Sequence, residues 1–199
     1  MNAIPYLDTI APLYGEADVW FLDIWGVLHN GVRPFPGAVH ACQNFRARGG
    51  RVILVSNSPR PRGGVEKQLD HIGVSKDVYD AVLTSGDVSR VLIAGFEGHP
   101  VYHLGPERDI TVFAGTGVEL ALANEAVAIV CTGLFDDETE IPHDYAERLA
   151  AFAKKRLPMI CANPDKTVER GGRIIYCAGA LAEAYEKLGG NVAYAGKPF

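Results

Sequence analysis

The sequence predicts an α/β protein with a mostly parallel sheet. Short apolar runs rich in β-branched residues alternate along the chain with longer segments that have the apolar spacing of helices. Segments of that length suit helical crossovers between parallel strands. The chain has 199 residues, 48% of them hydrophobic and 22% charged, which is an ordinary globular composition with enough apolar material for a substantial core.

The predicted elements follow one another in strand–helix order, with no internal repeat and no low-complexity segment. The strands are short β-branched runs, of which VWFL and RVILV are the first two, and they are expected at residues 19–22, 51–55, 100–104, 126–131, 158–162 and 191–195. The helices are the longer segments with helical spacing, expected at residues 37–48, 63–72, 86–94, 115–123, 143–156 and 179–188. Clustered turn residues indicate breaks near 96–100 and 189–190.

Composition excludes several classes of partner. The net charge of −5 and a pI near 5.7 argue against nucleic acid or an anionic membrane as the main partner. No apolar run is long enough to span a bilayer, and residues 1–20 lack the basic start of a signal peptide, so a cytoplasmic location is the default expectation. The 4 cysteines form no CxxC pair, which favours reduced core thiols over a zinc or redox site.

Three strand ends carry groups that suggest phosphoryl chemistry. Asp23 follows the first strand, Ser56-Asn57-Ser58 follows the second, and Gly196-Lys197-Pro198 follows the last. Ligands of open α/β sheets bind beyond the carboxyl ends of the strands. A serine, backbone N–H groups and a lysine can bind phosphate oxygens, and a carboxylate can attack phosphorus once a cation such as Mg²⁺ offsets their repulsion. Each signal alone also fits a helix cap, a turn or a surface lysine.

The ordered motifs LDIWGVLHNG, VSNSPR, ANPD, CAGALAEAYEKLGG and AGKP resemble those of the haloacid dehalogenase superfamily. The closest branch is class IIA, the sugar-phosphate and nitrophenyl-phosphate phosphatases with a large α/β cap. The resemblance implies a Rossmann-like core that begins at residues 1–97 and resumes at 192–199, with an inserted cap at 98–191. It also implies a small phosphorylated metabolite as substrate and a homodimer formed through the cap.

The resemblance assigns roles to matching positions. Asp23 resembles the phosphate-accepting nucleophile, Ser56 the phosphate-binding hydroxyl and Lys197 the charge-stabilising lysine. Asp23 and the backbone carbonyl of Trp25 would hold Mg²⁺. The implied substrate contacts are Trp25, Gly26, Asn57, Ser58, Arg60, Asp165 and Lys166.

Two departures from the family pattern stand out. Trp25 occupies the place of a second aspartate that acts as general acid and base, and an indole can do neither. The chain also stops two residues after Lys197, before the acidic motif that completes the family's metal site, so the C-terminal part of the core is expected to be missing and Mg²⁺ binding to be weak. The main function expected is a Mg²⁺-dependent phosphomonoester hydrolase that forms an aspartyl phosphate. The alternative is a catalytically impaired relative that binds a phosphorylated metabolite or a protein partner.

Other features leave two interpretations open or exclude rival classes. The acidic stretch 134–140 and the stretch 163–170 fit either solvated turns or substrate loops of a cap. The 6 histidines have no ligand spacing. A dehydrogenase fingerprint fails because Leu120 stands where a third glycine belongs, and a P-loop fails because Pro198 follows Lys197.

Overall fold

The computed structural model describes residues 7–199. Residues 1–6, part of the N-terminal segment predicted not to be a signal peptide, lie outside the described residues. The chain divides into two compact units: the residues up to Val55 together with Gln68–Val82 form the first, and Ser56–Lys67 with Leu83–Phe199 form the second. The predicted cap, residues 98–191, falls within the second unit, and its boundaries stay a prediction. Within the described part of the chain, no helix is both long enough and apolar enough to cross a membrane.

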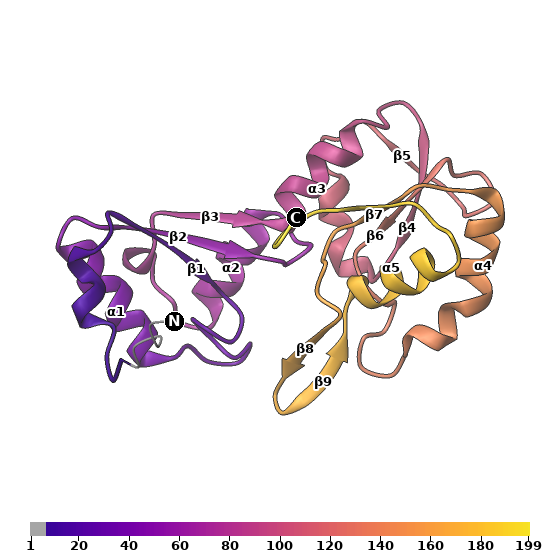
Figure 1. Cartoon of the computed structure of the whole chain (residues 1–199). Coiled ribbons are helices and arrows are strands. Elements are labelled where there is room, and N and C mark those ends of the chain that lie inside the picture. The colour runs from indigo at the N-terminus through magenta and orange to yellow at the C-terminus, as the bar shows by residue number, and fades with distance from the viewer. Residues whose placement is uncertain (1–6) are drawn as a thin grey trace, which may run out of the picture. The chain divides into compact units, whose positions relative to one another are not determined.

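The first unit is built on a small sheet of order β1-β2-β3 (Figure 1). β1 and β2 pair in parallel, and the register sets Asp23 opposite Val55 at their carboxyl ends. Helix α1 packs on one face, where the Trp20 ring stacks on Phe45 at a centroid distance of 4.0 Å. The alternation of a strand sends Phe21 to the opposite face, where it is exposed. One sheet face therefore holds the core of this unit.

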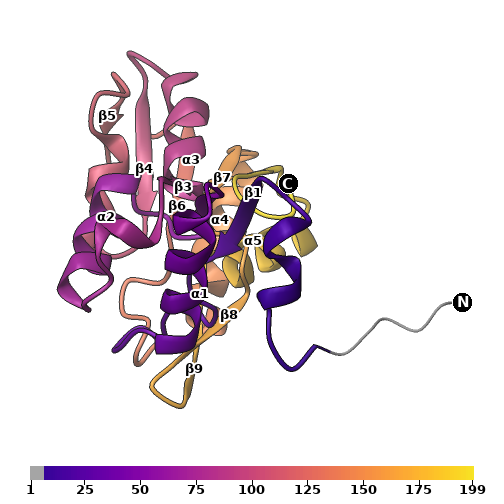
Figure 2. The same ribbon diagram turned by 90° about the vertical axis from the view of Figure 1, so that its left-hand side faces the viewer.

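The second unit is a three-layer α/β structure around a parallel sheet of order β10-β7-β6-β4-β5. The central strand β6 is buried on both faces, as parallel strands with helices on both sides are. Ile129 and Cys131 join the core formed with α4 and α5, whereas Ala128 and Val130 join the core formed with α3 and the 3₁₀ helix η3. The β8–β9 hairpin extends away from this sheet in both views (Figure 1 and Figure 2).

The elements have the following bounds. Up to the end of β3 they are η1 Ala11–Gly15, β1 Val19–Asp23, α1 Pro36–Ala47, β2 Arg51–Ser56, α2 Arg62–His71, η2 Lys76–Val78 and β3 Ala81–Thr84. The next ones are α3 Ser85–Ala94, β4 Pro100–Leu104, η3 Glu107–Phe113, β5 Glu119–Leu120, β6 Ala128–Cys131 and η4 Pro142–Tyr145. The last are α4 Ala146–Lys155, β7 Met159–Cys161, β8 Thr167–Arg170, β9 Arg173–Tyr176, α5 Ala178–Lys187 and β10 Val192–Tyr194.

The α/β class with parallel sheets is confirmed, and all six predicted strands are present. The predicted helix at 115–123 is wrong, because Gly115 and Gly117 adopt positive φ and the chain then forms the edge strand β5. Strand β3 was not predicted. The β8–β9 hairpin was missed as well, although its Gly171-Gly172 turn, with both φ values positive, is a typical hairpin signal.

Candidate functional site

The candidate residues of the first unit lie on the loop that follows β1. Asp23 ends the strand, and the loop turns back on itself because Leu28 N–H donates to the Ile24 carbonyl at 2.8 Å and Gly26 N–H to the His29 carbonyl at 2.8 Å. Ile24 and Leu28 anchor the loop in the core with 2% and 1% exposure. The backbone that carries Asp23 and Trp25 is therefore fixed by packing and by its own hydrogen bonds.

The Trp25 indole packs within this loop. Its ring meets His29 edge to face at a centroid distance of 5.4 Å, and it covers Gly31 closely enough that a Cβ there would lie 2.6 Å from the indole Cη2. His29 is buried, its Nδ1 accepts the Gly31 N–H at 2.9 Å, and burial lowers the pKa of its imidazole. The indole thus has a packing role in the loop, and it is not a side chain that can act as an acid or a base.

Two glycines of this loop form a matched pair for testing the packing of Trp25. Gly26 and Gly31 have φ values of +79° and +87°, but a Cβ at Gly26 would meet nothing within 4 Å. Gly26→Ala is expected to lower the free energy of unfolding by about 1–2 kcal/mol through backbone strain alone. Gly31→Ala adds the displacement of the indole and should cost roughly 1–3 kcal/mol more. Denaturant unfolding monitored by tryptophan fluorescence measures the free energy of unfolding of both variants. Equal losses of this free energy would contradict the packing of Trp25 against Gly31.

The candidate phosphate loop, residues 56–60, lies in the second unit. Ser56 Oγ accepts the Ser58 N–H at 3.1 Å, and the Ser58 carbonyl accepts the Gly86 N–H at 3.0 Å. A Cβ at Gly86 would lie 2.3 Å from the Pro59 carbonyl oxygen, so only glycine allows the start of α3 to approach the loop this closely. The first turn of α3 therefore fixes the course of the loop.

The Asn57 amide holds the segment that carries Lys197. Its Oδ1 accepts the Lys197 N–H at 2.8 Å, and its Nδ2 donates to the Lys197 carbonyl at 3.2 Å and to Asp165 Oδ1 at 2.9 Å. Ser85 Oγ donates to the carbonyl of Ala195, and Gly196, at φ +115°, has no room for a Cβ beside Asn57. Asn57, predicted to contact substrate, here ties three segments together: the loop 56–60, Asp165 and Lys197.

Replacing Asn57 with alanine is expected to release the Lys197 segment. The change removes three hydrogen bonds from a side chain that is 9% exposed, and it should lower the free energy of unfolding by about 1–3 kcal/mol. Asn124→Ala is the control, because Asn124 lies on an exposed turn. Thermal unfolding compares the two variants, and an equal small change in both would show that the amide does not hold the segment.

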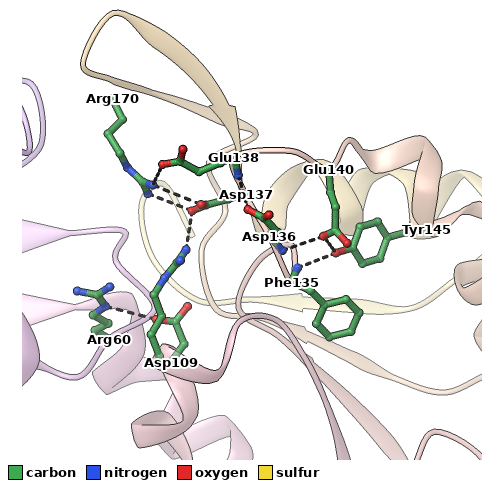
Figure 3. Close-up of polar contacts among 10 residues, drawn as sticks. Arg60, Asp109, Phe135, Asp136, Asp137, Glu138, Glu140, Tyr145 and Arg170 are labelled. Atoms are coloured by element: carbon green, nitrogen blue, oxygen red, sulfur yellow. Dashed lines mark hydrogen bonds and ion pairs between the residues drawn. The ribbon is translucent and has the colours of Figure 1, made fainter.

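The remaining candidates of this unit lie in different surroundings. Arg60 Nε lies 3.4 Å from Asp109 Oδ1 (Figure 3), and burial raises the pKa of Asp109 while Arg60 opposes that rise. Asp165 stands with Asn57, as described above. Lys166 instead pairs with Glu183 on α5 at 2.7 Å, with a largely exposed side chain. The structure therefore groups Asp165 with the phosphate loop and leaves Lys166 on the surface.

Sequence reasoning did not single out Arg108 and Asp109, and it covered Asp137 only as part of the stretch 134–140. Asp137 accepts from Arg108 at 2.5 Å and from Arg170 at 3.0 Å, and Asp109 follows Arg108 directly in η3. A signal was present, because residues 105–109 and 132–137 follow β4 and β6, at the carboxyl edge of the sheet where ligands of parallel sheets bind. The acidic stretch 134–140 also forms turns, since Asp136 accepts the Glu138 N–H at 3.0 Å.

Mg²⁺ suits the donors on the loop after β1. The Asp23 carboxylate and the Trp25 carbonyl are oxygen donors, and residues 7–199 contain no cluster of three or more metal-binding side chains. Mg²⁺ usually takes only one or two carboxylates from a protein and completes its shell with waters and substrate phosphate oxygens. The residues present therefore fit this ion better than a metal that needs a full protein cage.

The parallel sheets, with polar groups at the carboxyl ends of their strands, define an α/β protein. The family model of the haloacid dehalogenase-like hydrolases matches residues 20–119. A haloacid dehalogenase-like hydrolase from Brucella suis is 49% identical, with a TM-score of 0.94, over 97% of this chain and 71% of that one. The chain belongs to the haloacid dehalogenase-like hydrolases, as the sequence motifs indicated.

More distant solved structures share the fold. A possible sugar phosphatase from Cytophaga hutchinsonii is 22% identical, with a TM-score of 0.81, over 98% of this chain and 72% of that one. A glycerol phosphate phosphatase from Mycobacterium tuberculosis, in complex with magnesium, is 25% identical, with a TM-score of 0.69, over 94% of this chain and 56% of that one. A possible sugar phosphatase and a glycerol phosphate phosphatase are the kinds of protein expected of the branch that the motifs resemble. No curated protein sequence matches this chain at a significant level.

Proposed function

We propose that the protein is a Mg²⁺-dependent phosphomonoesterase that acts on a small phosphorylated metabolite through an aspartyl phosphate at Asp23. The observation that best supports the proposal is the bond between Asn57 and Lys197. Asn57, the residue next to Ser56, accepts the Lys197 N–H at 2.8 Å and donates to the Lys197 carbonyl at 3.2 Å. A hydroxyl and an ammonium group on two segments that are joined through their backbones suit a dianionic phosphate. A related glycerol phosphate phosphatase in complex with magnesium agrees with this chemistry.

The chain's own residues divide the reaction between them. The Asp23 carboxylate attacks phosphorus, the bond from phosphorus to the leaving oxygen breaks, and an acyl phosphate forms on Asp23. Ser56 Oγ donates a hydrogen bond to a phosphoryl oxygen, and Lys197 Nζ offsets the charge on the transferred group. Water then attacks phosphorus and gives up a proton to solvent, the bond from phosphorus to the Asp23 oxygen breaks, and inorganic phosphate leaves. Asp23 and the Trp25 carbonyl would hold Mg²⁺, which would offset the repulsion between carboxylate and phosphate.

One observation favours the alternative, a relative that binds a phosphorylated ligand with little turnover. The Trp25 indole is engaged with His29 and Gly31, and it takes the place of the family's general acid and base. Without that group, both proton transfers of the reaction lose their catalyst, at a typical cost of about 10²–10⁴-fold in rate. Such an enzyme is expected to be slow on substrates whose leaving group needs a proton.

A phosphatase screen tests the proposal. The protein is assayed with Mg²⁺ on a panel of sugar phosphates, glycerol phosphate and 4-nitrophenyl phosphate, with EDTA as the control. Hydrolysis that requires Mg²⁺ is the expected result. Binding of several phosphorylated compounds without any hydrolysis would favour the alternative. If the protein neither binds nor hydrolyses any of these compounds, both proposed functions are contradicted.

A further inference from the structure

A surface cavity of about 380 Å³ lies at the edge of the five-stranded sheet where β5 ends. β5 pairs with β4 only at Pro100 and Val101, whereas β4 continues to Leu104. The chain then leaves the line of β5 through a turn, in which Glu125 N–H donates to the Leu122 carbonyl at 3.0 Å. The position beside the last residues of β4 is therefore open. The residues that line the cavity are Tyr102, His103, Leu120, Ala121, Leu122 and Glu125.

The main chain of His103 points toward this open position. The Val101 carbonyl accepts the Ala121 N–H from the β5 side at 3.0 Å, and the Leu104 carbonyl accepts from Thr132 on the β6 side at 2.9 Å. Successive residues of a strand direct their N–H and carbonyl groups to opposite sides. His103, two positions after Val101, therefore directs both groups to the side where β5 has ended. A strand edge that is open in this way is a template for another strand.

The side chains around this edge offer apolar contact. Leu120 and Leu122 are 48% and 67% exposed, so both leucines have apolar surface that a bound segment could cover. Tyr102 forms a fixed wall, because its ring packs against Phe152 at a centroid distance of 5.6 Å. Apolar surface next to free main-chain groups suits an extended peptide, which supplies side chains and main-chain hydrogen bonds together.

The cavity carries one negative charge. Among the described residues that line it, only Glu125 is charged, because burial lowers the pKa of the His103 imidazole to about 4 and keeps that ring neutral at physiological pH. The nearby cations are engaged: Arg148 donates to the Tyr102 hydroxyl at 2.5 Å, and Lys155 donates to backbone carbonyls of the turn at 3.2 and 3.4 Å. A basic side chain of a bound segment would therefore find a carboxylate partner at Glu125.

We propose that this cavity is a docking site for an extended segment of a partner protein, which binds as an additional strand beside His103. The N–H and carbonyl of His103 pair with one residue of that segment. An apolar side chain of the segment covers Leu120 and Leu122, and a lysine or arginine faces Glu125. The contact is short, so the complex is a transient one.

The docking site is separate from the proposed catalytic groups. β5 is one edge of the sheet and β10, which precedes Lys197, is the other, so the two strands are four spacings or about 19 Å apart. Figure 2 shows β5 on the opposite side of the second unit from the C-terminus. Docking at β5 therefore goes beyond the proposed phosphatase function and does not depend on it.

The test is an amide NMR titration of the full chain with a capped pentapeptide of alternating valine and lysine. One pair of main-chain hydrogen bonds with limited apolar contact predicts a dissociation constant of about 0.1–1 mM. We expect amide shifts at His103 and at residues 120–125, and none at residues 56–58 or Lys197. The same peptide with every amide nitrogen methylated has no N–H to donate to the His103 carbonyl, and it should bind about 10-fold more weakly.

Two variants test the side-chain contacts. Leu122→Ala should weaken peptide binding by about 3- to 10-fold without a change in the unfolding temperature, because Leu122 is largely exposed. Leu188→Ala is the matched control and should leave binding unaltered, because Leu188 is 48% exposed but follows α5. The parent should prefer the valine–lysine peptide over a valine–glutamate peptide by about 2- to 5-fold, and Glu125→Gln should remove that preference.

The outcomes decide the proposal independently of the phosphatase function. No amide shift at about 1 mM peptide, shifts confined to other parts of the chain, or equal binding of the methylated peptide each overturns the docking site. If the amides of His103 and residues 120–125 shift with protein concentration alone, a second copy of this chain fills the cavity and the proposed partner is wrong. Hydrolysis of 4-nitrophenyl phosphate is measured separately, so failure of the docking site leaves the proposed function standing, and failure of the proposed function leaves the docking site standing.

Discussion

Replacement of Asp23 with asparagine is expected to abolish phosphomonoester hydrolysis. The amide has nearly the same shape as the carboxylate but is no nucleophile, so no acyl phosphate can form. Loss of a covalent nucleophile typically costs roughly 10⁴-fold or more in kcat. Asp23 ends β1 opposite Val55, in a loop anchored by buried residues, so the fold should tolerate the change. Steady-state kinetics with 4-nitrophenyl phosphate measures the loss.

A neighbouring aspartate supplies the control for this experiment. Asp18 is exposed and directly precedes β1, and only its backbone carbonyl takes part in the sheet, accepting the Arg51 N–H at 2.9 Å. Asp18→Asn makes the same chemical change five positions away and should leave kcat unaltered. If Asp23→Asn keeps most of the parent rate in a preparation free of other phosphatases, Asp23 is not the nucleophile.

The second large effect is expected at Trp25. If the indole takes the place of a general acid, the deficit depends on the leaving group, because nitrophenolate leaves without a proton whereas a sugar alkoxide needs one. The protein should therefore be relatively better on 4-nitrophenyl phosphate than on sugar phosphates. Trp25→Asp introduces a carboxyl group and should raise the rate on alkyl phosphates by about 10²–10⁴-fold, which narrows that gap.

The packing of Trp25 requires a control for lost volume. Both Trp25→Asp and Trp25→Asn remove the indole from His29 and Gly31, but only the aspartate can transfer a proton. Rates for the parent and both variants are measured across leaving groups of graded pKa, with unfolding curves to verify the fold. A higher rate on alkyl phosphates in Trp25→Asp, but not in Trp25→Asn, supports the interpretation that a general acid is missing. The same leaving-group dependence in all three proteins would mean that proton transfer does not limit the rate.

Much of the fold could be predicted from local pattern. Parallel strands that are buried on both faces leave a continuous apolar run, which identified β6. The predicted helix at 115–123 failed because its apolar spacing was given more weight than Gly115 and Gly117, whose positive φ ends any helix. Short elements such as β3 and η3 are held by tertiary packing, which leaves little trace in the local sequence.

Part of the candidate site could likewise be predicted from the sequence, and part could not. Asp23, Ser56 and Lys197 were predicted because the sequence places each at or just after the end of an apolar run, and in the structure Asp23 and Ser56 end β1 and β2 while Lys197 follows β10. The role of Asn57 as a bridge to Lys197 could not be predicted, because it depends on contacts between residues 140 positions apart. For the same reason Lys166 was expected at the substrate, although its partner Glu183 lies on α5. Long-range ion pairs of this kind follow from the fold alone.

Detection of the acyl phosphate tests the central proposal most directly. The protein is mixed with 4-nitrophenyl phosphate and Mg²⁺, quenched in acid within one turnover, digested and examined by mass spectrometry. Because Trp25 cannot activate water, the intermediate should accumulate. We expect one phosphoryl group on Asp23 in the presence of Mg²⁺ and none with EDTA. Hydrolysis with no phosphoryl group on Asp23 at any quench time, or with the group on another residue, would contradict the proposed mechanism.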